Sequence, residues 1–158
     1  MTSDSSTSSI LRTFRFCRKL PGGTALFGLI LGRKVPYTGT IRARVEELTP
    51  GHSKVRMADR RRLRNHLRSI HAIALANLGE LATGLAMMAA LPADARGIPM
   101  EIKVEFLKKA RGEITAEGSC SVPDVSVRNE HPVEALLCDE DGDKVARFSA
   151  RWMVGPKS

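Results

Sequence analysis

NHLRSIHAIALANLGELATGLAMMAAL, residues 65–91, is the stretch that decides the fold of this chain. After a polar and basic start it is apolar for about six helical turns, and the next proline is Pro92. Alanine and glycine are interspersed with leucine and methionine on most sides, which predicts a helix buried nearly all round. Ser69 stands where the N-cap of this helix would lie.

Glu80 is the one charged residue within the apolar part of this helix. A carboxylate is costly to bury unless it is paired, hydrogen-bonded or used in chemistry. One interpretation is a structural carboxylate that meets water or an arginine at an interface. The other, which we favour, is a catalytic group.

The composition limits the possible partners. A chain of 158 residues is expected to form one domain, and its net charge of +8 calls for an anionic ligand or surface. Aromatic residues make up only 4%, too few to favour stacking on bases, so we expect no nucleic-acid partner. Three widely spaced cysteines indicate reduced thiols and a cytoplasmic protein. Polar interruptions in the central helix indicate no membrane span or membrane partner.

Hydropathy patterns predict strands on both sides of the central helix. Residues 40–48 and 53–59 alternate in polarity and form a predicted hairpin, and four more strands follow the helix. The predicted non-strand segments are helices at 10–20 and 24–32, an extended turn at 35–39 and a loop at 92–99. The side chains expected to face inward are Ile41, Ala43, Val45, Val55, Met57, Ile102, Val104, Phe106, Ile114, Ala116, Cys120, Val122, Ala146, Phe148, Ala150 and Trp152.

Two strands, one long helix and four strands predict an α+β domain, with an antiparallel sheet curled around the helix. This order, together with Asn65, His71-Ala72 and Glu80, resembles hotdog-fold acyl-CoA thioesterases of the phenylacetic-acid type and their small uncharacterised, DUF4442-like relatives. The family pattern is an Asn, a His six residues later followed by a small residue, and an acidic residue nine beyond the His. Ala72 stands where the family usually has Gly, and Glu80 where it usually has Asp, although a related branch uses Glu.

The resemblance covers roughly residues 40–155 and implies a hotdog fold of about six strands around one helix. The predicted organisation is therefore a disordered N-terminus at 1–9, a helical extension at 10–39 and the hotdog domain at 40–155.

The spacing of His71 and Glu80 adds a geometric constraint. Nine residues of helix place the two on opposite sides and about 13 Å apart along the axis, so one helix cannot bring both to one substrate. If both act together, the site combines two chains in a homodimer with two equivalent sites. Pairing of dimers into tetramers stays open.

The resemblance implies hydrolysis of an acyl-CoA thioester. The backbone N–H of Ala72 would stabilise the oxyanion, and Glu80 of the partner chain would act as general base or as nucleophile. Asn65 would position the water or the carboxylate, and His71 would fix the loop or bind the thioester end. Thr83 could hold the carboxylate or the water, and Asn77 could orient Glu80 or hydrogen-bond in the core.

A basic loop precedes the helix. Arginine matches phosphate geometry, so this loop could bind the phosphates of coenzyme A, although a solvated loop is the plainer interpretation. The candidates are Arg60, Arg62, Arg64 and Arg68. We expect no metal, because the histidines lack ligand spacing, and no cofactor other than coenzyme A as part of the substrate. Two alternatives remain: a hotdog dehydratase, and a non-catalytic acyl-CoA or lipid-binding module, favoured by Ala72 in place of Gly.

Overall fold

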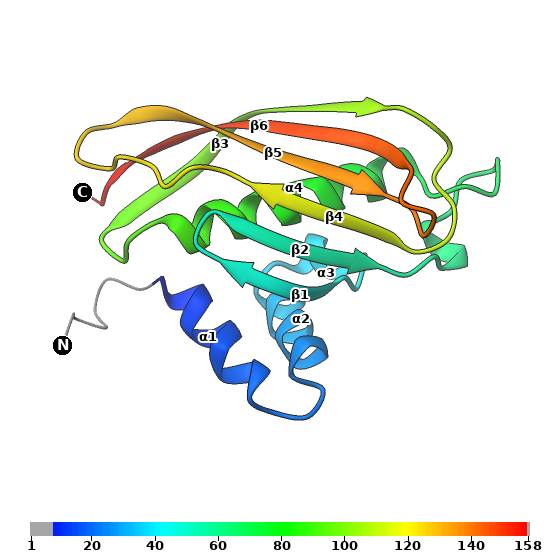
Figure 1. Cartoon of the computed structure of the whole chain (residues 1–158), viewed down its shortest axis with the longest axis horizontal. Helices are drawn as coiled ribbons and strands as arrows, with labels where there is room; N and C mark the ends of the chain where they lie inside the picture. The colour runs from blue at the N-terminus through cyan, green and yellow to red at the C-terminus, as the bar shows by residue number, and fades with distance from the viewer. Residues whose placement is uncertain (1–7, 158) are drawn as a thin grey trace.

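The computed structural model describes residues 8–157 as a six-stranded antiparallel sheet with a long helix across its inner face (Figure 1). The strand order is β1-β2-β4-β5-β6-β3. The elements are α1 (Ser9–Arg18), α2 (Gly23–Lys34), α3 (Pro36–Gly39), β1 (Arg44–Thr49), β2 (His52–Met57), the 3-10 turn η2 (Arg61–Leu63), α4 (Ala72–Ala90), β3 (Ala95–Phe106), β4 (Ile114–Ser119), β5 (Asn129–Cys138) and β6 (Lys144–Pro156). The predicted α+β hotdog arrangement is confirmed.

Small residues let the sheet approach α4 closely. A Cβ atom on Gly118 of β4 would lie 2.4 Å from the carbonyl oxygen of Ala82, and one on Gly79 would lie 2.6 Å from the ring of Phe148. The Ser53 hydroxyl donates a buried hydrogen bond of 2.7 Å to the same Ala82 carbonyl. The alanine and glycine content of α4 therefore sets how tightly the sheet wraps around it.

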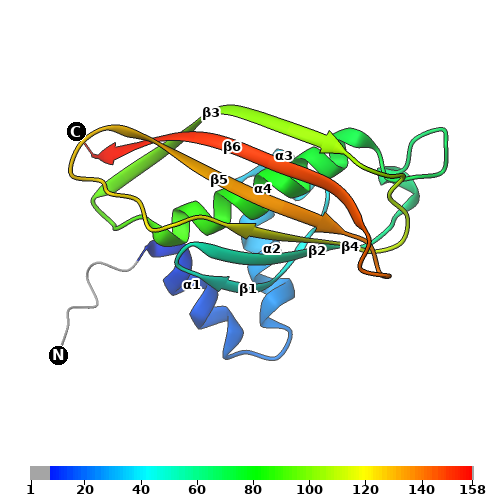
Figure 2. The same ribbon diagram turned by 45° about the horizontal axis from the view of Figure 1, so that its top comes forward.

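The length and composition of α4 would also suit a membrane-spanning helix. About 67% of the relevant segment is buried inside the domain, under the sheet in Figures 1 and 2. A core helix passes the same test of length and composition.

Several predicted boundaries are wrong. The predicted turn at 35–39 contains the short helix α3, which starts with Pro36 at a position where proline suits a helix. The predicted loop at 92–99 is already strand from Ala95, because β3 is an edge strand, where Pro99 is tolerated. Val122 is 66% exposed rather than inward, because β4 ends at Ser119 and the chain then leaves the sheet.

The first strand also starts later than predicted. β1 begins at Arg44, and a bulge after Val45 moves the next buried position to Leu48. The predicted inward residues of β2 and β6 are confirmed, with Val55, Met57 and the alternate residues from Ala146 to Trp152 all buried.

The N-terminal helices lie beside β1, at the end of the sheet away from β3 (Figures 1 and 2). The ring of Phe14 in α1 packs edge-on against that of Phe27 in α2, with centroids 5.1 Å apart. Of the predicted disordered segment, residues 1–7 lie outside the described residues, while Ser8 is the N-cap of α1 and Ser9 begins it.

The opposite edge of the sheet exposes apolar side chains. Val104 of β3 pairs with Phe148 and thus lies on the α4 side of the sheet, as predicted. On the same face, however, Ile102 and Phe106 are 53% and 52% exposed. No described strand follows β3 at this edge, so its inner face stays largely uncovered.

Candidate active site

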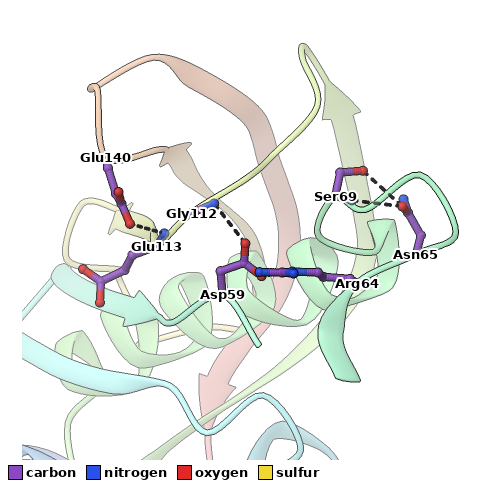
Figure 3. Close-up of polar contacts among 7 residues, drawn as sticks. All are labelled: Asp59, Arg64, Asn65, Ser69, Gly112, Glu113 and Glu140. Atoms are coloured by element: carbon purple, nitrogen blue, oxygen red, sulfur yellow. Dashed lines mark hydrogen bonds and ion pairs between the residues drawn. The ribbon is translucent and has the colours of Figure 1, made fainter. Parts of the chain in front are cut away.

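The loop before α4 is organised by Asn65. Its side-chain Oδ1 accepts hydrogen bonds from both the N–H and the hydroxyl of Ser69 (Figure 3). The same oxygen accepts from the N–H of Leu67. Its backbone N–H donates to the Ser69 carbonyl at 2.8 Å. Ser69 is thus part of this loop and not the N-cap, and that prediction is wrong. Asn65 uses its acceptor oxygen to hold the loop, which leaves its amide Nδ2 as the group that could meet a ligand.

A second set of contacts fixes this loop to the rest of the domain. Asp59 accepts from Arg64 Nε at 2.7 Å and from the Gly112 N–H at 3.1 Å, and so connects the loop to the turn before β4. In the same turn, the Glu113 N–H donates to Glu140 (Figure 3). The segment before α4 is therefore anchored to the turn before β4 through Asp59.

His71 is the N-cap of α4. Its Nδ1 accepts from the N–H of Ile73 at 3.1 Å, and its own backbone N–H donates to Leu63. An Nδ1 that accepts carries no proton, so the neutral ring has its proton on Nε2. The exposed ring thus offers a hydrogen-bond donor outward, which fits a group that binds a carbonyl better than a general base.

The first helical N–H groups are unequally satisfied. Those of Ala74 and Leu75 both donate to the His71 carbonyl, and that of Ile73 donates to the His71 ring. The N–H of Ala72 meets no acceptor among residues 8–157. It therefore points out of the positive end of the helix dipole as a free donor, the requirement for binding an oxyanion.

Glu80 lies on a stripe of α4 that the sheet does not cover. Ile73 and Met88, at helical spacing on either side of it, are 54% and 38% exposed, and Glu80 itself is partly buried. Burial raises the pKa of Glu80 above its ordinary value. Within the described part of the chain, no cation lies close enough to pair with it. A desolvated, unpaired carboxylate is suited to proton transfer.

Two further residues flank this carboxylate, and the sequence did not single them out. A Cβ atom on Gly84 would lie 3.7 Å from Glu80 Oε1 and 3.8 Å from the indole ring of Trp152. Trp152 is only 5% exposed, and its Nε1–H has no partner in the described structure. Alternation along β6 predicted that Trp152 faces inward, but only the fold brings it next to the Glu80 side chain.

The other predicted site residues have structural partners. The hydroxyl of Thr83 donates to the backbone carbonyls of Gly79 and Glu80, so its proton is not available to the carboxylate. The side chain of Asn77 donates to the Tyr37 carbonyl at 3.2 Å, which attaches α3 to α4. Of the two roles open to Asn77, the structure supports the core hydrogen bond.

The four candidate arginines divide into two pairs. Arg64 pairs with Asp59, and Arg60 donates to the carbonyls of Ile41 and Arg42. Burial, and then the nearby charges of Arg62 and Arg42, lower the pKa of Arg60. Arg62 and Arg68 are exposed and have no acidic partner among the described residues. These two remain available for an anionic ligand.

The structure does not bring the two ends of the predicted site together within one chain. Ala72 and Glu80 are eight residues apart on a straight helix, about 12 Å along its axis. In one chain, the unsatisfied N–H of Ala72 and the partly buried carboxylate of Glu80 therefore lie at two separate places on α4.

The fold is that of the hotdog proteins, and a family match together with solved structures connects it with the thioesterase superfamily. A family model described as domain of unknown function (DUF4442) matches residues 23–154, and the chain belongs to that family. The match begins inside the predicted N-terminal extension and includes α2.

Solved structures share this fold over most of the chain. The structural-genomics protein APC5556 is 28% identical, with a TM-score of 0.82, and the match covers 94% of this chain and 99% of the other. A Pseudomonas aeruginosa protein described as a probable thioesterase is 26% identical, with a TM-score of 0.76 and coverage of 87% and 97%. A thioesterase family protein from Silicibacter pomeroyi, 24% identical with a TM-score of 0.69 and coverage of 82% and 96%, shares the fold. Among curated proteins, no sequence matches significantly.

Proposed function

We propose that this protein hydrolyses acyl-CoA thioesters as a homodimer with two shared active sites. The observation that carries the proposal is Glu80, a desolvated and unpaired carboxylate on the uncovered stripe of α4. The free N–H of Ala72 supplies the second element that thioester hydrolysis needs, a donor for the oxyanion.

The homodimer is supported by the uncovered apolar surface. The stripe of α4 around Glu80 and the inner face of β3, with Ile102 and Phe106, are both apolar and exposed, and the two elements contact each other. An exposed edge strand with an apolar face is a surface for pairing with another chain. A twofold axis here would place Ala72 of the partner subunit near Glu80 and complete both sites.

In the proposed mechanism, Glu80 takes a proton from a water molecule, and the resulting hydroxide attacks the thioester carbonyl carbon. The carbonyl oxygen becomes an oxyanion and accepts the N–H of Ala72 of the partner subunit. The carbon–sulfur bond then breaks, and the thiolate of coenzyme A takes the proton from Glu80, leaving a free acid. The raised pKa of Glu80 makes it a stronger base than an ordinary carboxylate once it is ionised.

Recognition of the nucleotide is assigned to the two unpaired arginines of the loop, Arg62 and Arg68. A fork of N–H donors suits a phosphate, and Arg60 and Arg64 are already held by other partners. Coenzyme A thus enters as part of the substrate, and the proposed chemistry uses no separate cofactor.

The test compares acyl-CoAs from acetyl to palmitoyl and aryl types, with free-thiol release as the measurement. Glu80→Gln removes the base at nearly constant shape and is expected to lower kcat at least about 100-fold. Ala72→Pro removes the oxyanion donor alone, because proline is favoured at the first helical position and the extended backbone of His71 can precede it. A loss of kcat of the same order is expected for Ala72→Pro.

Matched controls are Glu105→Gln, an exposed carboxylate on β3, and Ala72→Gly, which keeps the N–H; both should stay active. If the wild type binds acyl-CoAs but hydrolyses none of them, the chain is a binding module and the thioesterase proposal is wrong. Hydration of a 2-enoyl-CoA without thiol release would instead identify the dehydratase branch.

A further inference from the structure

Helix α2 is apolar and yet lies largely at the surface. Of its twelve residues, only Gly23 and Phe27 are buried. Leu26 and Leu29 are 38% and 61% exposed, and large apolar side chains in the neighbouring segments are exposed as well. The further exposed residues are Phe16, Leu20, Val35 and Tyr37. Six exposed large apolar side chains within residues 16–37 indicate a contact that the described chain does not make.

The same part of the chain carries the positive charge of the protein. Residues 8–45 contain eight basic side chains and no acidic one. These eight charges equal the net charge of +8 of the whole chain. They are Arg12, Arg15, Arg18, Lys19, Arg33, Lys34, Arg42 and Arg44. In the rest of the chain, basic and acidic residues balance. The basic charge and these exposed apolar residues thus occur in the same N-terminal segment, residues 8–45.

A groove brings both features together. It has a volume of about 630 Å³ and lies between α2, α3 and the start of β1. Gly28, Gly32 and Gly39 line it where these backbones pack closely against one another. Leu29 and Arg33, one turn apart on α2, line it together with Arg42 and Arg44, and Arg62, assigned above to coenzyme A, borders it. Within the described chain no carboxylate pairs with Arg33, Arg42 or Arg44. The groove therefore offers apolar contact and unneutralised charge side by side.

We propose that α1, α2 and the groove beside them form a docking surface for a membrane rich in acidic phospholipids. Apolar side chains of α2 enter the boundary between headgroups and acyl chains, while the arginines meet the phosphates. This surface lies at the β1 end of the sheet, opposite the β3 edge assigned to the homodimer (Figure 2). It departs from the expectation that the protein has no membrane partner.

The test is co-sedimentation of the full chain with vesicles of phosphatidylcholine alone or mixed with phosphatidylglycerol, without substrate. Binding is expected only to the acidic vesicles and should be lost near 1 M salt, where the Debye length is about 3 Å. The triple variant Arg33→Gln, Arg42→Gln and Arg44→Gln is expected to lose roughly 100-fold in partition coefficient, from roughly fivefold per arginine. Leu29→Ser is expected to lose roughly tenfold.

The matched charge control is Arg128→Gln, Lys144→Gln and Arg147→Gln, which removes equal charge from exposed positions elsewhere. The matched apolar control is Val127→Ser, at 62% exposure against 61% for Leu29. Both controls should bind like wild type. Equal loss of binding in both triple variants would show that only net charge matters and would overturn the proposal. The proposal is also wrong if the wild type does not bind acidic vesicles, or if Leu29→Ser by itself changes the oligomeric state. Because no substrate is present, these outcomes are independent of thioesterase activity.

Discussion

Burial of the Glu80 side chain connects the stability of the domain to its proposed chemistry. Because burial raises the pKa of Glu80 above its ordinary 4.5, the folded state binds this proton more tightly than the unfolded state. Ionisation therefore destabilises the fold as pH rises through the interval between the two pKa values. The penalty is absent below the unfolded pKa and complete above the folded one.

We therefore expect Glu80→Gln to raise the Tm at pH 7–8 although it removes activity. The gain should shrink as pH falls and vanish below about pH 4, where the wild-type carboxyl is protonated in both states. Thermal unfolding followed by circular dichroism across this pH range measures it, with Glu105→Gln as the exposed control. A lower Tm for Glu80→Gln at neutral pH would mean that the native carboxylate is paired.

Two glycines of helix α4, Gly79 and Gly84, allow the contribution of packing to be distinguished from the contribution to function. Alanine in place of glycine stabilises an open helix position by about 1 kcal/mol. At Gly84 the added methyl group finds ordinary contact distances of 3.7 Å and more, whereas at Gly79 it would meet the Phe148 ring at 2.6 Å. The two positions should thus respond in opposite directions.

Gly84→Ala is expected to raise stability by up to about 1 kcal/mol. It should nonetheless lower kcat/KM, because the methyl group would lie within contact distance of both the Glu80 carboxylate and the Trp152 ring. Gly79→Ala is expected to destabilise by about 1–3 kcal/mol through overpacking. Urea unfolding together with the thiol-release assay measures both variants. Full activity in a stabilised Gly84→Ala would show that substrate and water do not use this space.

At the scale of the whole molecule, the shared site has a consequence that a single-chain site would not have. Glu80→Gln disables the carboxylate of its own chain, and Ala72→Pro disables only the oxyanion donor. A dimer with one chain of each kind keeps one site in which both groups are intact. Half of randomly mixed dimers are of this kind, so about one quarter of wild-type activity should return.

The measurement is thiol release after subunits of the two inactive variants are co-refolded in equal amounts. A mixture of either variant with itself is the control and should remain inactive. If the mixed sample stays inactive although size-exclusion chromatography shows dimers, the two groups do not act on one substrate.

Much of the fold could be predicted from local patterns. The alternation in β2 and β6 and the apolar helix around Glu80 follow from the amino-acid order alone, because strand and helix periods are local geometric properties. The predictions at 92–99 and Val122 were wrong because a strand starts or ends according to the strand with which its backbone pairs, and distant segments supply that partner. The prediction at 35–39 was wrong for a local reason, because Pro36 suits the start of a helix as well as a turn.

The candidate site divides in the same way. The sequence by itself determined that Asn65, His71, Ala72 and Glu80 have family spacing, and that one helix cannot join His71 and Glu80, because helical rise and rotation are constant. Only the tertiary structure decided that Asn65 holds a loop, that His71 caps α4 and that the Ala72 N–H is left free. It also placed Trp152 beside Glu80 and left the inner face of β3 uncovered. The positions of Trp152 and β3 depend on contacts between segments far apart in the chain, which no local pattern encodes. The hydrogen bonds of Asn65 and His71 are local, but they need a loop conformation that Asp59 ties to Gly112 in a distant turn.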